Sequence, residues 1–471
     1  MRRYILIGAS AFVLGAGSMA YFSQAARSAT EVQPDTYHQL ELFGNVLDTV
    51  ERQYVDPVNE KKLIDAALSG MVTSLDPHSD YLAPTAYSEM QDETRGEYGG
   101  LGLEITSEDG IIKVITPIDG TPAAKAGIKS GDYITAVNGQ TVLGLSVNDA
   151  VKQMRGKIGD EVTLTIARAK TPPFDVKLTR QIIQPKAVTY KLEGDFGYVR
   201  LAEFNEKATD ETRNAIEALK TRDPHLKGLI LDLRDNPGGL LDQAVGVASL
   251  FLDGGEVVSE RGRDPQDVER YNATPGVKVD GLPVVVLINS GTASAAEIVA
   301  GALQDRHRAA LVGLTSFGKG SVQTVIPLRG GLDGALKLTT GRYYTPSGRS
   351  IQRTGIEPDL EVAETREEAQ QIANEAFQFS EASFHNALSS QDGEVRVGPH
   401  EPAEEPPPGF NEKTGDFQLS RAEDVLRYGS VAATPKLPKP AATLADADIL
   451  RQAHEAAMRA AAHAAAPAKK N

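Results

Sequence analysis

The sequence predicts an α/β (mixed α+β) core, preceded by a helical segment and by an inserted β-rich domain, and followed by a partly disordered C-terminal tail. Three observations lead to this fold class. Strand-like runs alternate with helical runs after residue 185, and apolar residues recur at helical spacing before residue 90. Between these two regions lie strand-like runs that are interrupted by glycines. Such alternation is typical of layered α/β structures. The expected segments are 1–30, 31–95, 96–183, 184–362 and 363–471.

Length, charge and composition exclude several classes of function. The 471 residues suffice for two or three domains, and the formal net charge of −15 argues against nucleic acid as the main partner. With no cysteine, the chain has no disulfide, no thiolate metal site and no cysteine nucleophile. The eight histidines form no H-E-x-x-H motif. We therefore expect neither a metal nor a cofactor.

The N-terminus has the layout of an export signal. Two arginines precede an apolar stretch at 4–22, and small residues follow it. An uncleaved membrane anchor also fits this length. Under either interpretation we expect the rest of the chain outside the cytoplasm, in the bacterial periplasm or on the outer face of the inner membrane.

Residues 36–90 are predicted to be helical. Apolar side chains recur at helical spacing in two groups, Leu40, Phe43, Leu47 and Val50, then Leu63, Ala67 and Met71. The stretch 76–82 interrupts them and places His78 between carboxylates. A metal ligand is one interpretation of His78, but a turn held by aspartate and serine hydrogen bonds is favoured.

The inserted β-rich domain begins with a glycine-rich loop. Residues 99–105 precede a strand but lack the third glycine and the helix of a dinucleotide fingerprint. The backbone N–H groups of such a glycine-rich loop, next to an exposed strand edge, are instead suited to bind the terminal carboxylate of a peptide. A tight turn at Asn138-Gly139, a helix at 147–154 and a strand at 161–168 complete the domain.

The core is predicted from strands at 196–201 and 226–233 and helices at 209–220 and 240–252. The loop 234–240 between the second strand and the second helix contains proline and two glycines, Gly238 and Gly239. A βα turn alone explains these residue types. The alternative is an oxyanion hole, because glycine lets a backbone N–H approach a developing negative charge.

Ser294 follows a buried strand at 282–289 and begins a helix that runs to residue 303. Ser294 and Glu297 have the spacing of a capping box, so a helix cap is one interpretation. The other is a nucleophile whose base is Lys319, which lies between two glycines four residues before Gln323. Lysine acts as a base only when burial or nearby cations keep it neutral.

Two further motifs overlap this stretch. Ser316 and Lys319 fit the S-x-x-K pattern of penicillin-recognising enzymes, but Gly318 disfavours the required helix and the S-D-N and K-T-G partners are absent. Residues 313–319 fit a phosphate loop, except that Gly320 stands where a serine or threonine is needed. Both hypotheses are therefore disfavoured.

The motifs together resemble the carboxyl-terminal processing proteases, which are tail-specific serine peptidases with an inserted PDZ domain. The resemblance is carried by residues 291–298 and 318–323, and residues 122–139 resemble a PDZ domain. It covers 36–362 well and the tail poorly. Ala296 departs from the pattern, because many members carry a second serine there.

The resemblance implies a serine endopeptidase with a Ser–Lys dyad that cleaves proteins with exposed apolar C-termini. Its implied catalytic residues are Ser294, Lys319 and Gln323, the last as the amide that orients the lysine. Its implied oxyanion donors are the N–H of Ala295 and that of Gly238 or Gly239. Its implied peptide-binding residues are Leu101, Gly102 and Leu103. A homo-oligomer and an adaptor protein are compatible with the resemblance.

A catalytically inactive PDZ adaptor in the periplasm is the main alternative, and the intact Ser294, Lys319 and Gln323 disfavour it. In the tail, residues 401–408 are low-complexity, so we expect no fixed structure there. Residues 417–427 fit a short docking helix, and the alanine-rich stretch 444–466 fits another helix.

Overall fold

The computed structural model describes residues 34–437 except 109, 119, 146, 265, 277, 280, 375–379, 391–398 and 413. The predicted export signal and the alanine-rich helix lie outside these residues. None of the helices within the described ranges combines the length and the apolar character needed to cross a bilayer.

The N-terminal segment is helical, as predicted. The chain divides into two units at residue 71, and the first unit holds α2 (Pro34–Gln53) and most of α3 (Glu60–Thr73). The second unit begins with a turn in which Asp76 accepts hydrogen bonds from the backbone N–H groups of His78 and Ser79, both at 2.9 Å. This confirms the predicted aspartate turn. The turn leads into β1 (Asp80–Leu82) and α4 (Pro84–Thr94).

The inserted domain is a six-stranded antiparallel sheet packed against two short helices. The predicted helix and strand occur within the expected bounds as α6 (Val147–Met154) and β7 (Glu161–Arg168). The other elements are β3 (Leu103–Glu108), β4 (Ile111–Pro117), α5 (Pro122–Lys125), β5 (Tyr133–Val137), β6 (Gln140–Thr141) and β8 (Thr171–Thr179). Where the chain enters and leaves this domain, β2 (Tyr98–Gly100) pairs with β9 (Gln181–Ile183).

The core contains a six-stranded sheet with the order β10-β11-β12-β15-β16-β19, in which only the β10–β11 pair is antiparallel. Parallel strands covered on both faces are expected to be continuously apolar, and all five residues of β12 and of β15 are buried. The strands are β10 (Val188–Glu193), β11 (Phe196–Leu201), β12 (Gly228–Asp232), β15 (Val284–Ile288), β16 (Ala310–Gly313) and β19 (Leu360–Glu361).

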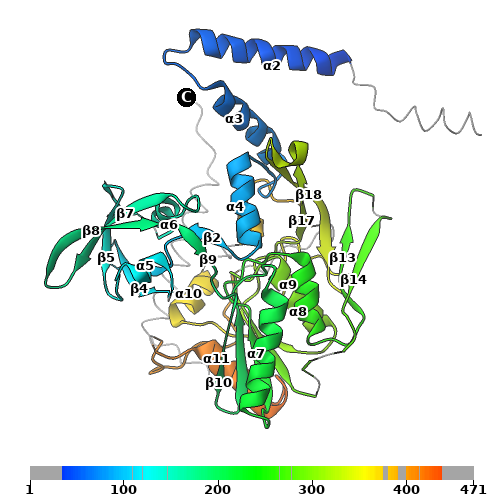
Figure 1. Cartoon of the computed structure of the whole chain (residues 1–471). Helices are drawn as coiled ribbons and strands as arrows, with labels where there is room; N and C mark the ends of the chain where they lie inside the picture. The colour runs from blue at the N-terminus through cyan, green and yellow to red at the C-terminus, as the bar shows by residue number, and fades with distance from the viewer. Residues whose placement is uncertain are drawn as a thin grey trace, which may run out of the picture. The chain divides into compact units, whose positions relative to one another are not determined.

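Helices cover both faces of this sheet. One face packs against α7 (Ala208–Arg222), α8 (Leu241–Ser249) and α9 (Ala295–Asp305), which lie together in Figure 1. The other face packs against α11 (Phe417–Tyr428), the predicted docking helix.

A second sheet lies beside the first one and carries the segment after Lys319. Its order is β1-β18-β13-β14, with β17 also paired to β18. The strands beyond β1 are β13 (Glu256–Arg261), β14 (Val268–Asn272), β17 (Ser321–Pro327) and β18 (Ala335–Tyr344). Two 3-10 turns (Leu328–Gly331 and Glu381–Ser383) and α10 (Arg366–Asn374) complete the described elements.

The expectation of no fixed structure at 401–408 is wrong. Pro402, Glu404 and Pro406 are buried. The Glu404 carboxylate accepts hydrogen bonds from the Arg421 guanidinium at 2.5 and 3.0 Å, and both side chains are almost fully buried. The local composition suggested a solvated stretch because it does not include Arg421. This partner, which neutralises Glu404, lies on α11, later in the sequence.

Candidate active site

Ser294 lies on a strained turn between β15 and α9. Its φ of 54° and ψ of −115° are unusual for a residue other than glycine, and such a conformation persists only where the surroundings impose it. The turn is fastened to the loop after β12. Thr292 Oγ1 donates to the Leu233 carbonyl at 2.8 Å, and the Ala293 N–H donates to the Asn236 carbonyl at 2.9 Å. Ser294 is thereby held at the carboxyl edge of the parallel sheet.

The glycine pair of the 234–240 loop passes directly beside Ser294. A Cβ atom at Gly238 would lie 2.8 Å from Ser294 Cβ and 2.9 Å from the Ala295 nitrogen, and Gly238 has a φ of 101°. Only glycine fits there without strain or displacement. The predicted oxyanion residues Gly238, Gly239 and Ala295 thus come together around Ser294.

The two glycines differ in how their N–H groups are used. The Gly238 N–H donates to Asn236 Oδ1 at 2.9 Å, and the Asn236 Nδ2 group in turn donates to the Leu201 carbonyl at 2.8 Å. An N–H engaged in this way is not free to stabilise an oxyanion. The geometry therefore favours Gly239 over Gly238 as the donor from this loop.

The loop that carries Lys319 is fixed through its backbone. The Ser316 N–H donates to the Ile356 carbonyl at 3.1 Å, and the Phe317 N–H donates to the Thr292 carbonyl at 2.9 Å. The last of these bonds joins the lysine loop to the turn of Ser294. A buried loop requires such pairing, because unpaired backbone groups away from water are costly.

Glu297 connects the two loops from the first turn of α9. One carboxylate oxygen accepts from the Ser294 N–H at 2.8 Å and from the Lys319 N–H at 2.9 Å. The other accepts from Ser316 Oγ at 2.5 Å and from the Gly318 N–H at 2.7 Å. Burial raises the pKa of Glu297 to about 7, against the four hydrogen bonds that favour its charged form.

This arrangement settles two interpretations of the sequence. The glutamate contact expected of the capping box is present, and the same carboxylate also holds the lysine loop. The Ser316 hydroxyl is fully buried, donates to Glu297 and accepts from the Ile356 N–H at 2.7 Å. A hydroxyl bonded on both sides and closed to solvent does not suit a nucleophile, so the S-x-x-K hypothesis is wrong for this site.

Lys319 lies in an environment that favours its neutral form. Burial, together with the nearby charge of Lys337, lowers the pKa of Lys319 to about 8, against the opposing effect of Glu381, Glu297 and Asp76. Within the described part of the chain, the Lys319 side chain has no hydrogen-bond or ion-pair partner. The Gln323 amide donates instead to Ser321 Oγ at 2.9 Å and Thr339 Oγ1 at 3.3 Å. The orientation of Lys319 by Gln323 remains a prediction.

A cavity of about 560 Å³ lies between the glycine loop and Gln323. Its lining is mostly apolar or aromatic: Gly239, Leu240, Leu241, Asp242, Val245, Tyr271, Val322, Gln323 and Tyr343. A cavity with such a lining, bounded by the predicted oxyanion residue Gly239, is suited to an apolar substrate side chain.

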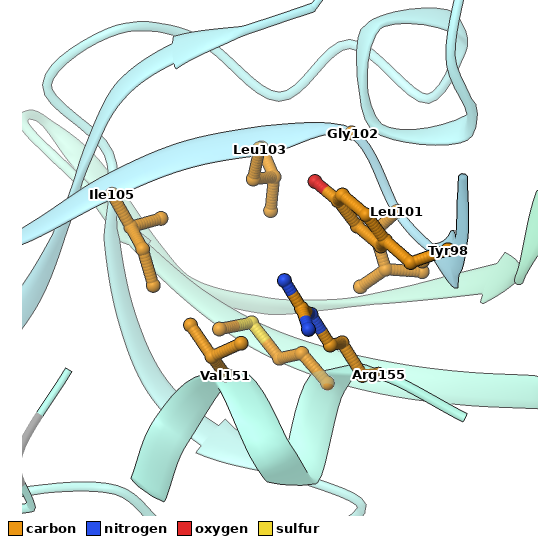
Figure 2. Close-up of a pocket in the computed structure, with 9 residues that line it drawn as sticks. Tyr98, Leu101, Gly102, Leu103, Ile105, Val151 and Arg155 are labelled. Atoms are coloured by element: carbon orange, nitrogen blue, oxygen red, sulfur yellow. The ribbon is translucent and has the colours of Figure 1, made fainter. Parts of the chain in front are cut away.

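A second, smaller cavity of about 100 Å³ lies in the inserted domain, between the loop before β3 and helix α6. Figure 2 shows the predicted residues Leu101, Gly102 and Leu103 along one side and Val151 on the helix opposite. Sequence reasoning missed Arg155, whose guanidinium stacks on the Tyr98 ring at 4.3 Å and pairs with Glu93 at 3.0 Å. The only signal for Arg155 was its position directly after the predicted helix.

Comparisons with known proteins agree with this architecture. Three family models match the chain: peptidase family S41 at 195–362, a PDZ domain at 113–168, and the N-terminal domain of the activating protease CtpB at 6–85. A carboxy-terminal-processing protease from Bartonella bacilliformis is 50% identical over 365 residues, which cover 77% of this chain and 83% of that protein. The chain belongs to the carboxy-terminal-processing proteases of peptidase family S41.

Two further relatives of this carboxy-terminal-processing protease are less similar in sequence than the Bartonella protein. A probable CtpA-like serine protease of Staphylococcus aureus is 38% identical over 326 residues, covering 69% of this chain and 64% of that one. Among solved structures, a photosystem II D1 C-terminal processing protease is 33% identical, with a TM-score of 0.42 over 68% of this chain and 92% of that chain. The predicted family, its serine peptidase activity and its PDZ domain are confirmed.

Proposed function

We propose that this carboxy-terminal-processing protease cleaves proteins with a Ser294–Lys319 dyad. One observation carries the proposal: a single buried carboxylate, that of Glu297, binds the backbone N–H groups of both residues. The lowered pKa of Lys319, about 8, supplies the neutral amine that a lysine base needs.

In the proposed reaction, Ser294 Oγ attacks the scissile carbonyl carbon while the neutral Lys319 amine takes the hydroxyl proton. The oxyanion is held by the N–H groups of Ala295 and Gly239. Lys319 then gives its proton to the leaving amine, and an acyl-enzyme remains. Water repeats the sequence with Lys319 again accepting the proton, which releases the carboxylic acid product and restores Ser294. Gln323 orients the lysine in this scheme.

The substrate in this proposal is a protein with an exposed apolar C-terminus. The PDZ groove takes the last side chain between Leu101, Leu103 and Val151, and the loop at Gly102 takes the terminal carboxylate. Arg155, whose guanidinium is paired with Glu93, lies at the same groove and supplies a cation near the carboxylate. The apolar cavity beside Gly239 takes a substrate side chain next to the scissile bond.

The proposed substrates are envelope proteins, since the basic and apolar N-terminal layout fits export. A homo-oligomer and an adaptor protein are compatible with this role. An inactive PDZ adaptor is the alternative, and the absence of turnover at every pH would favour it.

The first test uses an unfolded protein substrate that ends in apolar residues, with a free or an amidated C-terminus. We expect cleavage that is lost in Ser294→Ala and that has a KM about ten- to hundredfold higher on amidation, since a hydrogen-bonded charge is worth about 1.5–3 kcal/mol. Arg155→Ala should reduce the difference between the two substrates.

Lys152→Ala is the matched control, because it removes a positive charge from the same helix at a side chain that is 78% exposed and is not part of the groove lining. Cleavage that does not change on amidation would support the peptidase activity but contradict the proposal that the PDZ groove recognises the terminal carboxylate.

A further inference from the structure

The turn that joins α3 to β1 lies against the catalytic lysine loop. Asp76 and Ser79 are buried, and the Ser79 hydroxyl donates to the Asp76 carboxylate at 2.6 Å. Two chains of hydrogen bonds run from this turn toward Lys319, one through β18 and one through the segment after α10. Sequence reasoning treated the turn only as a break between helices.

The first chain reaches Gln323. Thr339 Oγ1 donates to Asp76 at 3.0 Å, and the Thr339 N–H donates to Ser79 Oγ at 3.0 Å. The same Thr339 hydroxyl accepts from the Gln323 amide at 3.3 Å. The Asp76 carboxylate therefore fixes one of the two hydroxyls that accept from the Gln323 amide, the other being that of Ser321.

The second chain of hydrogen bonds reaches residues on both sides of Lys319 in the sequence. His78 Nε2 lies 2.7 Å from Glu381 Oε2, and the Glu381 side chain is completely buried. The Gln352 amide donates to Glu381 at 2.9 Å and accepts from the Gly320 N–H at 3.0 Å. The Glu381 N–H donates to the Phe317 carbonyl at 3.0 Å.

The charges facing Lys319 come from four elements: Lys337 on β18, Glu381 on the 3-10 turn, Glu297 on α9 and Asp76 in the turn itself. His78 is linked to these charges through its contact with Glu381. Asp76 in this turn and Glu381 in the 3-10 turn are both buried near the lysine, and burying a charge is costly unless it is paired.

We propose that Asp76 and His78 are positioning residues of the catalytic base, Asp76 through Thr339 and Gln323, and His78 through Glu381. This inference rests on the proposed role of Lys319 as the base. Asp76 and Glu381 also raise the pKa of Lys319 against the lowering by burial, and Gln323 and the backbone on both sides of Lys319 fix the position of its amine.

The test measures kcat and KM across pH on the full chain for Asp76→Asn, Glu381→Gln and His78→Ala. We expect kcat to fall about ten- to hundredfold with KM unchanged, since small misplacements of a catalytic group cost this much. In Asp76→Asn and Glu381→Gln the midpoint of the rise in activity should move to lower pH, because removing a nearby negative charge favours the neutral amine. A merely structural turn would leave this midpoint in place.

One pair of variants and one control make the result decisive if Asp76→Asn folds poorly. Thr339→Val should lower kcat while Thr339→Ser restores it, because serine keeps the bridging hydroxyl. His400→Gln alters another histidine–glutamate pair, with Glu361 at 2.6 Å, and should leave kcat and the midpoint unchanged.

The possible failures are separable. Turnover in Lys319→Met would reject the proposed function itself. Loss of turnover in Lys319→Met, with wild-type kcat and midpoint in both charge variants and in Thr339→Val, would overturn this inference and leave the dyad intact.

Discussion

Replacing Lys319 by methionine is expected to lower kcat/KM by about 10⁴-fold or more, close to the loss in Ser294→Ala. Residues that act as one catalytic unit cause similar losses when either is removed. Methionine keeps the unbranched shape, has sulfur in place of one methylene and lacks the amine. Since burial already disfavours the charge of Lys319, the variant should unfold at a temperature no lower than that of the wild-type protein.

The pH profile separates a base from a structural lysine. With a pKa of about 8, Lys319 is mostly protonated at pH 7, so activity should rise through pH 8 and then level off. The folded pKa is below that of the unfolded chain. The unfolded state therefore binds more protons between about pH 8 and the usual lysine range, so stability should rise with pH across that window, and Lys319→Met should lose this dependence.

Lys337→Met gives a matched check on this account. Lys337 lowers the pKa of Lys319, so its removal should move the activity midpoint to higher pH while kcat at the plateau changes little. A midpoint that stays in place in Lys337→Met, or Lys319→Met with measurable turnover, would contradict the assignment of Lys319 as the base.

The core and the loops that carry Ser294 and Lys319 could be predicted because their sequence signals are local. A buried β-branched run, a serine at the start of a helix and a lysine between glycines each occupy a short window of sequence. Strand and helix preferences act over the same distance. The predicted turn at Asp76 was correct for the same reason.

The support around Lys319 could not be predicted, because its members meet only in the folded chain. His78 and Glu381 are 303 residues apart, and no pattern in either neighbourhood indicates the other. The choice between Gly238 and Gly239 depends on where the Asn236 side chain points. Likewise, the buried Glu404 at 401–408 depends on Arg421 from a later helix.

Substituting Glu297 is expected to damage both stability and catalysis, because one carboxylate serves the nucleophile turn and the lysine loop. Glu297→Ala leaves four donors without an acceptor in a fully buried site: the N–H groups of Ser294, Gly318 and Lys319 and the Ser316 hydroxyl. Each unsatisfied donor costs about 1–3 kcal/mol. We expect the free energy of unfolding, measured by denaturant titration, to fall by at least about 4 kcal/mol.

Glu297→Gln is the sharper variant because it preserves the volume. A glutamine has one carbonyl oxygen, so its NH₂ group must face either the pair Ser294 and Lys319 or the pair Ser316 and Gly318. An NH₂ group that faces Ser294 and Lys319 opposes two N–H donors, whereas one that faces Ser316 and Gly318 opposes the Gly318 N–H and requires the Ser316 hydroxyl to turn and accept. Either orientation weakens the link between the two loops. We expect kcat to fall about 10²-fold or more, with little change in binding at the PDZ groove, which Glu297 does not line.

The pH dependence of stability identifies the carboxylate as the cause. The pKa of Glu297 is raised to about 7 in the folded protein, above its usual value of 4.5, so the folded state binds more protons between these values. The contribution of Glu297 to stability is therefore present at low pH and lost as pH rises through 7, and Glu297→Gln should remove this slope. Glu404→Gln, a buried carboxylate in the tail, serves as the control: it should lose stability but keep kcat at temperatures where it remains folded. If Glu297→Gln kept wild-type kcat, the shared carboxylate would not be what joins Ser294 to Lys319.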